Sequence, residues 1–171
     1  GGLRALPSSL VELSIASVDP TPLSSEDLGH LVALRRLDMS GAILPDQAQL
    51  VSPVLEHLTL RSAAVAELLL STASLQTLDT SGAAALHHIE CENQCAPRHL
   101  DISGTALFAL PQTFSYQEIE VLDAEHTGLH SLAALEDASR LQSLSVAYTS
   151  ASDLSPLLHA ESLQDLDITC T

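Results

Sequence analysis

One short phrase returns eight times along the chain at nearly constant spacing. Two clear copies are Leu34-Arg-Arg-Leu37-Asp-Met-Ser-Gly and Leu75-Gln-Thr-Leu78-Asp-Thr-Ser-Gly. The middle leucines of the eight copies are Leu13, Leu37, Leu58, Leu78, Leu100, Leu122, Leu144 and Leu166. Successive middle leucines are 24, 21, 20, 22, 22, 22 and 22 residues apart. Because a repeat of this length buries its apolar side only against its neighbours, the period predicts one stacked array over residues 1–171.

Each copy contains the pattern of a short strand. In Leu100-Asp101-Ile102-Ser103, apolar and polar residues alternate, so the leucine and isoleucine point to one side. A strand this short must pair in parallel with its neighbours, and the rest of the copy carries the chain back. The returns over Ser25–Val32 and Pro45–Val51 are predicted as single helical turns, because acids or proline stand in their first turn. The three-residue spacing of leucines over Leu129–Leu135 predicts 3₁₀ geometry.

The pattern Leu-x-x-Leu-x-Leu, followed three residues on by Asn or a substitute, is similar to the leucine-rich-repeat family over essentially the whole chain. The second half resembles the 22-residue subtype of internalins and of a phosphatase-regulatory protein, and Asp153-Leu-Ser-Pro-Leu157 resembles a turn of that subtype. The resemblance implies an α/β repeat solenoid, a right-handed horseshoe or arc. Its parallel β-sheet would be concave, and its convex connections would be 3₁₀, helical or extended. The resemblance also implies protein recognition on the concave face.

The chain departs from the family at the position that usually holds Asn after the strand. Here this position holds Val18, Ala42, Ala63, Ala83, Thr105, Thr127, Thr149 and Thr171. Threonine forms hydrogen bonds through its side chain, whereas alanine and valine do not. Since buried backbone groups need partners, we expect water or backbone bonds to substitute in the first four copies, and a better-ordered C-terminal half.

The charge balance excludes some partners. The net charge is −16, from 22 acidic residues against six arginines and no lysine. Binding to nucleic acid or to an anionic membrane surface needs clustered cations, so neither is expected. No stretch approaches the ~20 apolar residues of a membrane span. The acidity permits a basic protein partner, although it also serves solubility.

Strand alternation places an acidic column in the middle of the predicted concave face. Its members are Asp38, Asp79, Asp101, Asp123 and Asp167. Neighbouring strands lie ~4.8 Å apart, so the column would bring like charges together. One interpretation is that Leu-Asp-Leu is a frequent phrase in these repeats and that one exposed carboxylate per strand costs little. The other is a strip that binds a partner rich in arginine or lysine.

A second candidate lies just past the strands, at the edge of the predicted sheet. The row Gly41, Ser62, Gly82 and Gly104 changes there to His126 and Tyr148. Tyr148 is expected to be exposed near His126 and Glu125, and an exposed aromatic beside acids is typical of a binding hot spot. The alternative is that the ring only covers the solenoid edge.

A cluster of histidines and cysteines follows in His87-His88-Ile-Glu-Cys91-Glu-Asn-Gln-Cys95. His88, Cys91 and Cys95 could bind zinc, but their spacing fits no common zinc finger and a second paired half is missing. A local Cys91–Cys95 disulfide would require an oxidising compartment. We favour free thiols, with Cys91 partly buried as a small hydrophobe. The odd total of three cysteines favours a reducing, intracellular compartment such as the cytoplasm.

The sequence contains no Gly-x-Ser-x-Gly elbow, phosphate loop or His-Glu-x-x-His helix. We therefore expect no enzymatic activity and no cofactor, and predict a protein–protein interaction module. A structural scaffold or spacer in a large assembly, or the targeting domain of a regulatory protein, are the alternatives. The chain begins within a repeat and stops where a strand ends, so we expect it to be a segment of a longer protein.

Overall fold

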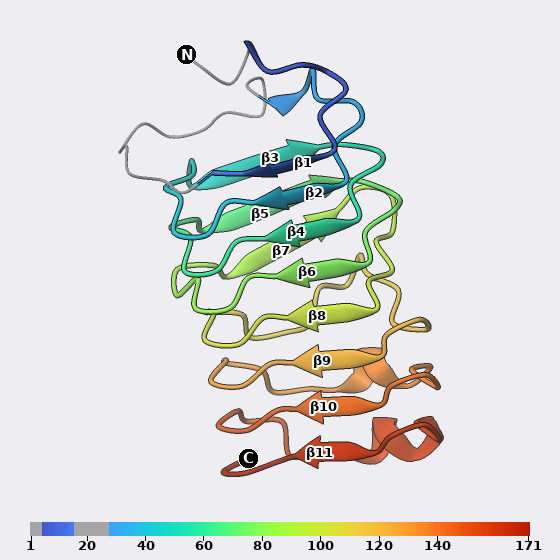
Figure 1. The fold of residues 1–171 in the computed structure, drawn as a ribbon. Coiled ribbons are helices and arrows are strands. Elements are labelled where there is room, and N and C mark those ends of the chain that lie inside the picture. The colour runs from blue at the N-terminus through green and yellow to red at the C-terminus, as the bar shows by residue number, and fades with distance from the viewer. Residues whose placement is uncertain (1–4, 16–27) are drawn as a thin grey trace.

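A computed structural model describes residues 5–15 and 28–171 (Figure 1). Eight parallel strands form one sheet in the order β1-β2-β4-β6-β8-β9-β10-β11. Their bounds are β1 Glu12–Ser14, β2 Arg36–Asp38, β4 His57–Thr59, β6 Thr77–Asp79, β8 His99–Asp101, β9 Val121–Asp123, β10 Ser143–Ser145 and β11 Asp165–Asp167. In every pair the middle leucines lie opposite one another, as Leu100 lies opposite Leu122. The predicted solenoid of short parallel strands is confirmed.

A second sheet, which the sequence did not predict, backs the N-terminal half. It contains β3 (Gln47–Val51), β5 (Glu67–Ser71) and β7 (His88–Cys91), all parallel. The predicted helical turn over Pro45–Val51 is therefore wrong. Along β3, exposed and buried residues alternate with period two, which suits a strand paired with β5. The other predicted turn, Ser25–Val32, begins outside the described residues.

The C-terminal returns differ from the N-terminal ones. The two helices placed in the described part of the chain are both 3₁₀: η2 (Ala133–Leu135) and η3 (Ser155–His159). The 3₁₀ prediction over Leu129–Leu135 is confirmed for its last three residues only, and Pro156 stands in the first turn of η3. Among the described residues, no helix is long and apolar enough to cross a membrane.

The two shortest repeats both have an extended return, although the repeat that contains β7 has 22 residues. The two shortest spacings, 21 and 20 residues, are Leu37 to Leu58 and Leu58 to Leu78, and they contain β3 and β5. A strand advances ~3.3 Å per residue and a 3₁₀ helix ~2.0 Å, so an extended return spans the same distance with fewer residues. The 22-residue repeats of the second half accommodate η2 and η3.

The interior is aliphatic and continuous. Its largest fully buried side chains are Leu31, Leu34, Met39, Leu55, Leu58, Leu60, Leu68, Leu70, Leu78, Leu86, Leu100 and Ile102. Tyr116 is also buried, and its hydroxyl donates to the Pro111 carbonyl at 3.0 Å. Burial ends abruptly at the last repeat, since Leu144 is 1% exposed and Leu166 is 43% exposed.

The position that replaces the family's Asn is satisfied in two ways. Thr105 Oγ1 donates to the Ile102 carbonyl at 2.7 Å, three residues back. The same side-chain bond recurs at Thr127, Thr149 and Thr171. In the alanine repeats the Ala63 N–H donates to the Leu60 carbonyl at 3.0 Å, with equivalent bonds at Ala42 and Ala83. The N–H groups of Thr105 and Thr171 form the same backbone bond at 3.3 Å, so it is not particular to the alanine repeats. Substitution by water or backbone bonds and better order in the C-terminal half stay predictions, and Val18 lies outside the described residues.

Candidate functional site

The acidic column lies on the outward face of the eight-stranded sheet, with each aspartate at the last position of its strand. The Asp101 Oδ1 atom accepts hydrogen bonds from the Ser103 N–H at 3.0 Å and the Ser103 hydroxyl at 2.6 Å. The same contact to the residue two positions on recurs at Asp38, Asp79, Asp123 and Asp167. Each aspartate therefore closes the turn after its strand. The recurring Asp-x-Ser in the sequence is a signal of this role, which sequence reasoning missed.

Arg61 neutralises the N-terminal part of the column. Its Nε atom lies 2.5 Å from the Asp79 Oδ2 atom. This hydrogen bond raises the pKa of the Arg61 guanidinium, and the charges of Asp79, Asp101 and Asp38 add to the effect. Asp79 is buried beneath the pair. The column is therefore not uniformly negative, a feature that alternation alone did not reveal.

The column has a gap at β10, where Ser145 stands in place of an aspartate. The Ser145 hydroxyl donates to the Glu125 Oε1 atom at 2.6 Å, so Glu125 reaches across from the preceding repeat. The Glu125 carboxylate thus takes the place of the aspartate that is missing at β10. We call Asp101, Asp123, Glu125 and Asp167 the acidic strip. It presents one carboxylate for each of the four strands β8 to β11.

The acidic strip forms no ion pair of its own, although Arg61 acts on Asp101 at its N-terminal end. None of the ion pairs formed in the described part of the chain involves one of its carboxylates. Burial raises the pKa of Asp123, and repulsion from Asp101, Glu125 and Asp167 adds to this effect, while the Glu125 N–H opposes it. The pKa of Asp167 is instead lowered by its hydrogen bonds to Thr169. Asp123 is therefore the member of the strip whose charge is disfavoured, first by burial and then by its acidic neighbours.

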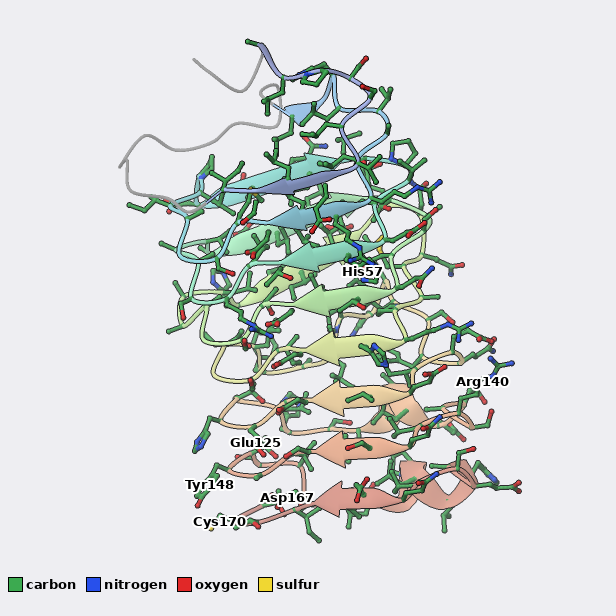
Figure 2. The ribbon with its side chains drawn as sticks, viewed as in Figure 1. His57, Glu125, Arg140, Tyr148, Asp167 and Cys170 are labelled. Atoms are coloured by element: carbon green, nitrogen blue, oxygen red, sulfur yellow. A yellow bond between two sulfur atoms is a disulfide. The ribbon has the colours of Figure 1, made fainter. Side chains whose placement is uncertain are left out.

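Most other arginines pair away from the strip. These pairs join neighbouring repeats and are Arg35–Glu56, Arg98–Glu120 at 3.0 Å and Arg140–Glu118 at 2.7 Å. Figure 2 shows Arg140 on one side of the sheet, while Glu125 and Tyr148 lie on the other, toward which the strand arrows point. Arg140 thus lies on the side of the sheet opposite to Glu125 and Tyr148.

The residue one turn past each strand has a left-handed backbone. The φ angles are 69° at Gly41, 53° at Ser62, 69° at Gly82, 65° at Gly104, 54° at His126, 56° at Tyr148 and 58° at Cys170. The N–H at this position donates to a carbonyl of the next repeat, as the Tyr148 N–H does to the Thr169 carbonyl at 2.8 Å. Glycine adopts such a φ without strain, whereas another residue costs about 1–2 kcal/mol. The repeat of Ser62 and the last three repeats described accept this cost.

His126 and Tyr148 form what we call the edge stack. Their ring centroids lie 4.4 Å apart and the ring planes differ by 8°. Tyr148 is 52% exposed, as the sequence predicted. The structure thus brings Glu125, His126 and Tyr148 to one edge. A second pair that sequence reasoning missed is Phe108 and His130, with centroids 6.4 Å apart.

The cysteines differ from the interpretation that we favoured. Cys91 and Cys95 form a disulfide and are buried, so the free-thiol interpretation is wrong for both. The zinc interpretation also fails, because His88 is exposed on the face of β7 opposite to Cys91. In residues 5–15 and 28–171, no three His, Cys, Asp or Glu side chains are placed to hold a metal ion. Cys170 is a free, exposed thiol. The expectation of a reducing compartment rested on the odd total of three cysteines and stays a prediction.

Neither protein-family models nor curated protein sequences match this sequence. Among solved structures, the leucine-rich-repeat domain of LRIM1 is similar with a TM-score of 0.62 and 16% identity, over 93% of this chain and 66% of that chain. LRIM1/APL1C gives 0.61 and 17%, over 92% and 43%. Internalin C2 from Listeria monocytogenes gives 0.49 and 16%, over 93% and 80%. The chain spans less than two thirds of the length of the first two. With its stacked strands and leucine core, it has the leucine-rich-repeat fold.

Proposed function

We propose that the chain is a protein-binding module whose acidic strip receives a basic protein partner. The observation that carries the proposal is the row of four carboxylates along β8 to β11, in which Glu125 reaches over β10, with no cation of the described residues paired to them. A protein partner is also supported by the fold, because LRIM1, a protein of similar fold, is solved in a complex with APL1C.

The turn-closing role of the aspartates leaves them free to bind. Asp101 and Asp123 each use Oδ1 for the turn, and their Oδ2 atoms accept no hydrogen bond from the described residues. An ionised carboxylate has about four lone-pair sites, so each retains acceptors for a cationic donor. Adjacent strands set these acceptors ~4.8 Å apart on a rigid sheet. A basic surface that matches this spacing needs no rearrangement of the strip.

The test is to recover the partner with the 171-residue chain, purify it, and measure its Kd at several salt concentrations. Asp101→Asn and Asp123→Asn keep an oxygen for the turn but remove the charge. Each is expected to raise the Kd about two- to fivefold at low salt, because one charge pair at this spacing contributes about 0.5–1 kcal/mol in water. Affinity is also expected to fall as salt rises.

The matched control is Asp153→Asn. Asp153 accepts the Ser155 N–H at 2.9 Å and so closes a similar turn, but it lies before η3 rather than on the sheet. Its substitution is expected to leave the Kd unchanged. A partner whose Kd depends on neither salt nor Asp101 and Asp123 would contradict the proposal.

A further inference from the structure

We infer that an arginine side chain of the partner binds where the acidic strip meets the edge stack, with its guanidinium against the Tyr148 ring and beside the Glu125 carboxylate. The inference rests on the proposed function and names the chemical group that the C-terminal edge of the strip selects.

The two halves of this site are joined by the backbone. Glu125 and His126 are consecutive, Tyr148 stacks on His126, and the Glu125 carboxylate is held by Ser145. Ser145 ends β10 and lies three residues before Tyr148. A carboxylate and a flat aromatic pair are therefore fixed at the same strand ends, as the positions of Glu125 and Tyr148 in Figure 2 show.

The rings occupy positions that the backbone would reserve for glycine. Gly41, Gly82 and Gly104 meet this requirement in earlier repeats, where Ser62 is the exception with a small side chain, whereas His126 and Tyr148 carry large rings at φ values of 54° and 56°. Stacking of the two rings returns only about 0.5–1.5 kcal/mol of the resulting strain. Strained residues that also expose a large ring are a recognised sign of a binding role, because stability alone would favour glycine.

The charge at this edge calls for a cation that the described residues do not supply. The pKa of Asp123 is raised by burial and by its acidic neighbours, including Glu125, so a bound cation would relieve their repulsion. A guanidinium suits both halves of the site, because it is planar, stacks on aromatic rings and pairs with a carboxylate through two N–H groups. A lysine ammonium has the charge and can lie over a ring, but it neither stacks flat nor pairs with a carboxylate through a planar fork. A second copy of this chain is disfavoured, since both copies carry a net charge of −16.

The probe is a short neutral-ended peptide with two arginines separated by glycine, compared with its lysine counterpart at low salt. The chain has no tryptophan and only two tyrosines, and Tyr116 is buried with its hydroxyl bonded. Tyr148 ring signals in NMR spectra therefore report on this edge alone. The arginine peptide is expected to shift them with a Kd about two- to fivefold below that of the lysine peptide, the advantage of a cation stacked on an aromatic ring at an exposed site.

Three variants complete the experiment. Tyr148→Gly removes the ring and relieves the strain, so the preference for arginine should disappear while the melting temperature holds or rises. Glu125→Gln keeps an oxygen for the Ser145 hydroxyl and should weaken both peptides. Cys170→Gly, at the same backbone position one repeat on, is the control and should change neither Kd.

Equal binding of the two peptides, or binding that leaves the Tyr148 signals unshifted, would overturn the inference. The acidic-strip proposal would not be affected by either result. Tyr148 signals that shift with protein concentration alone would assign the edge to a second copy and would overturn it too. The acidic-strip proposal has its own test: it fails if the partner's Kd depends on neither salt nor Asp101 and Asp123.

Discussion

Two aspartates of the acidic column, Asp38 and Asp123, affect the stability of the fold in opposite ways. At Asp38, hydrogen bonds from the Ser40 hydroxyl and N–H lower the pKa, so the charge stabilises the fold. At Asp123, burial and acidic neighbours raise the pKa, so the charge destabilises the fold although one N–H bond remains. The two residues differ first in the Ser40 hydroxyl bond, which Asp123 lacks, and in the burial of Asp123. Arg61 near Asp38 and the acids around Asp123 add to the difference.

Asp123→Asn is therefore expected to raise the free energy of unfolding at neutral pH by about 1 kcal/mol, the size of a like-charge contact at strand spacing. The folded pKa of Asp123 lies above its ordinary value of 3.8, so the wild-type chain loses stability as pH rises between these two values. The variant has no such group. Its advantage should be greatest at neutral pH and vanish below 3.8, as urea unfolding at a series of pH values would show.

Asp38→Asn is the matched control with the opposite sign. The folded pKa of Asp38 is lowered, so its stabilisation is complete above 3.8 and is lost as pH falls through the lower folded value. The variant should be less stable than the wild type at neutral pH and equal to it in strong acid. Equal effects of the two substitutions would show that the local acids around Asp123 do not set its energetics.

At the scale of elements, the sheet that carries the site was predictable and its backing was not. Each strand of the large sheet repeats one leucine phrase, and the leucine register follows from it. The strand β3 was missed because Pro45 and Asp46 resemble a helix start, while the alternation in Gln47-Ala-Gln-Leu-Val that favours a strand spans only five residues. Parallel pairing with β5 decides between them, and a single segment does not contain that information.

The candidate site was also predictable only in part. Alternation placed the aspartates, and the repeat register placed His126 and Tyr148 at the edge. The Glu125–Ser145 bond joins residues 20 apart and depends on which way a flexible glutamate turns, so no local pattern predicts it. The Cys91–Cys95 disulfide depends likewise on the loop after β7, where Gln94 has a φ of 52°.

Replacing both Cys91 and Cys95 by alanine is expected to lower the free energy of unfolding by about 2 kcal/mol, the loop-closure term for a ring of this size. Reduction of the wild-type chain by dithiothreitol should produce the same loss in thermal or urea unfolding. The double variant should not respond to the reductant. A chain whose unfolding is indifferent to both changes would show that the disulfide does not constrain the connection between β7 and β8.

At the scale of the molecule, the stability of any repeat depends on the repeats on either side of it. All eight middle leucines occupy the same register, so differences in their exposed fractions reflect only the repeats stacked on either side. Leu144 has a strand on both sides, β9 and β11, whereas Leu166 in β11 pairs only with Leu144 within the described sheet. This is why the same residue is 1% exposed in one repeat and 43% exposed in the next.

Leu144→Ala and Leu166→Ala therefore form a matched pair in the 171-residue chain. Leu144→Ala removes a fully buried side chain and should lower the free energy of unfolding by about 3 kcal/mol, within the range for buried leucines. Leu166→Ala should cost about 1 kcal/mol, because much of its apolar surface already meets water. Urea unfolding of both variants measures the difference. Equal losses would mean that the C-terminal repeat is packed as tightly as the interior, contrary to a stack in which each repeat is held by its nearest neighbours.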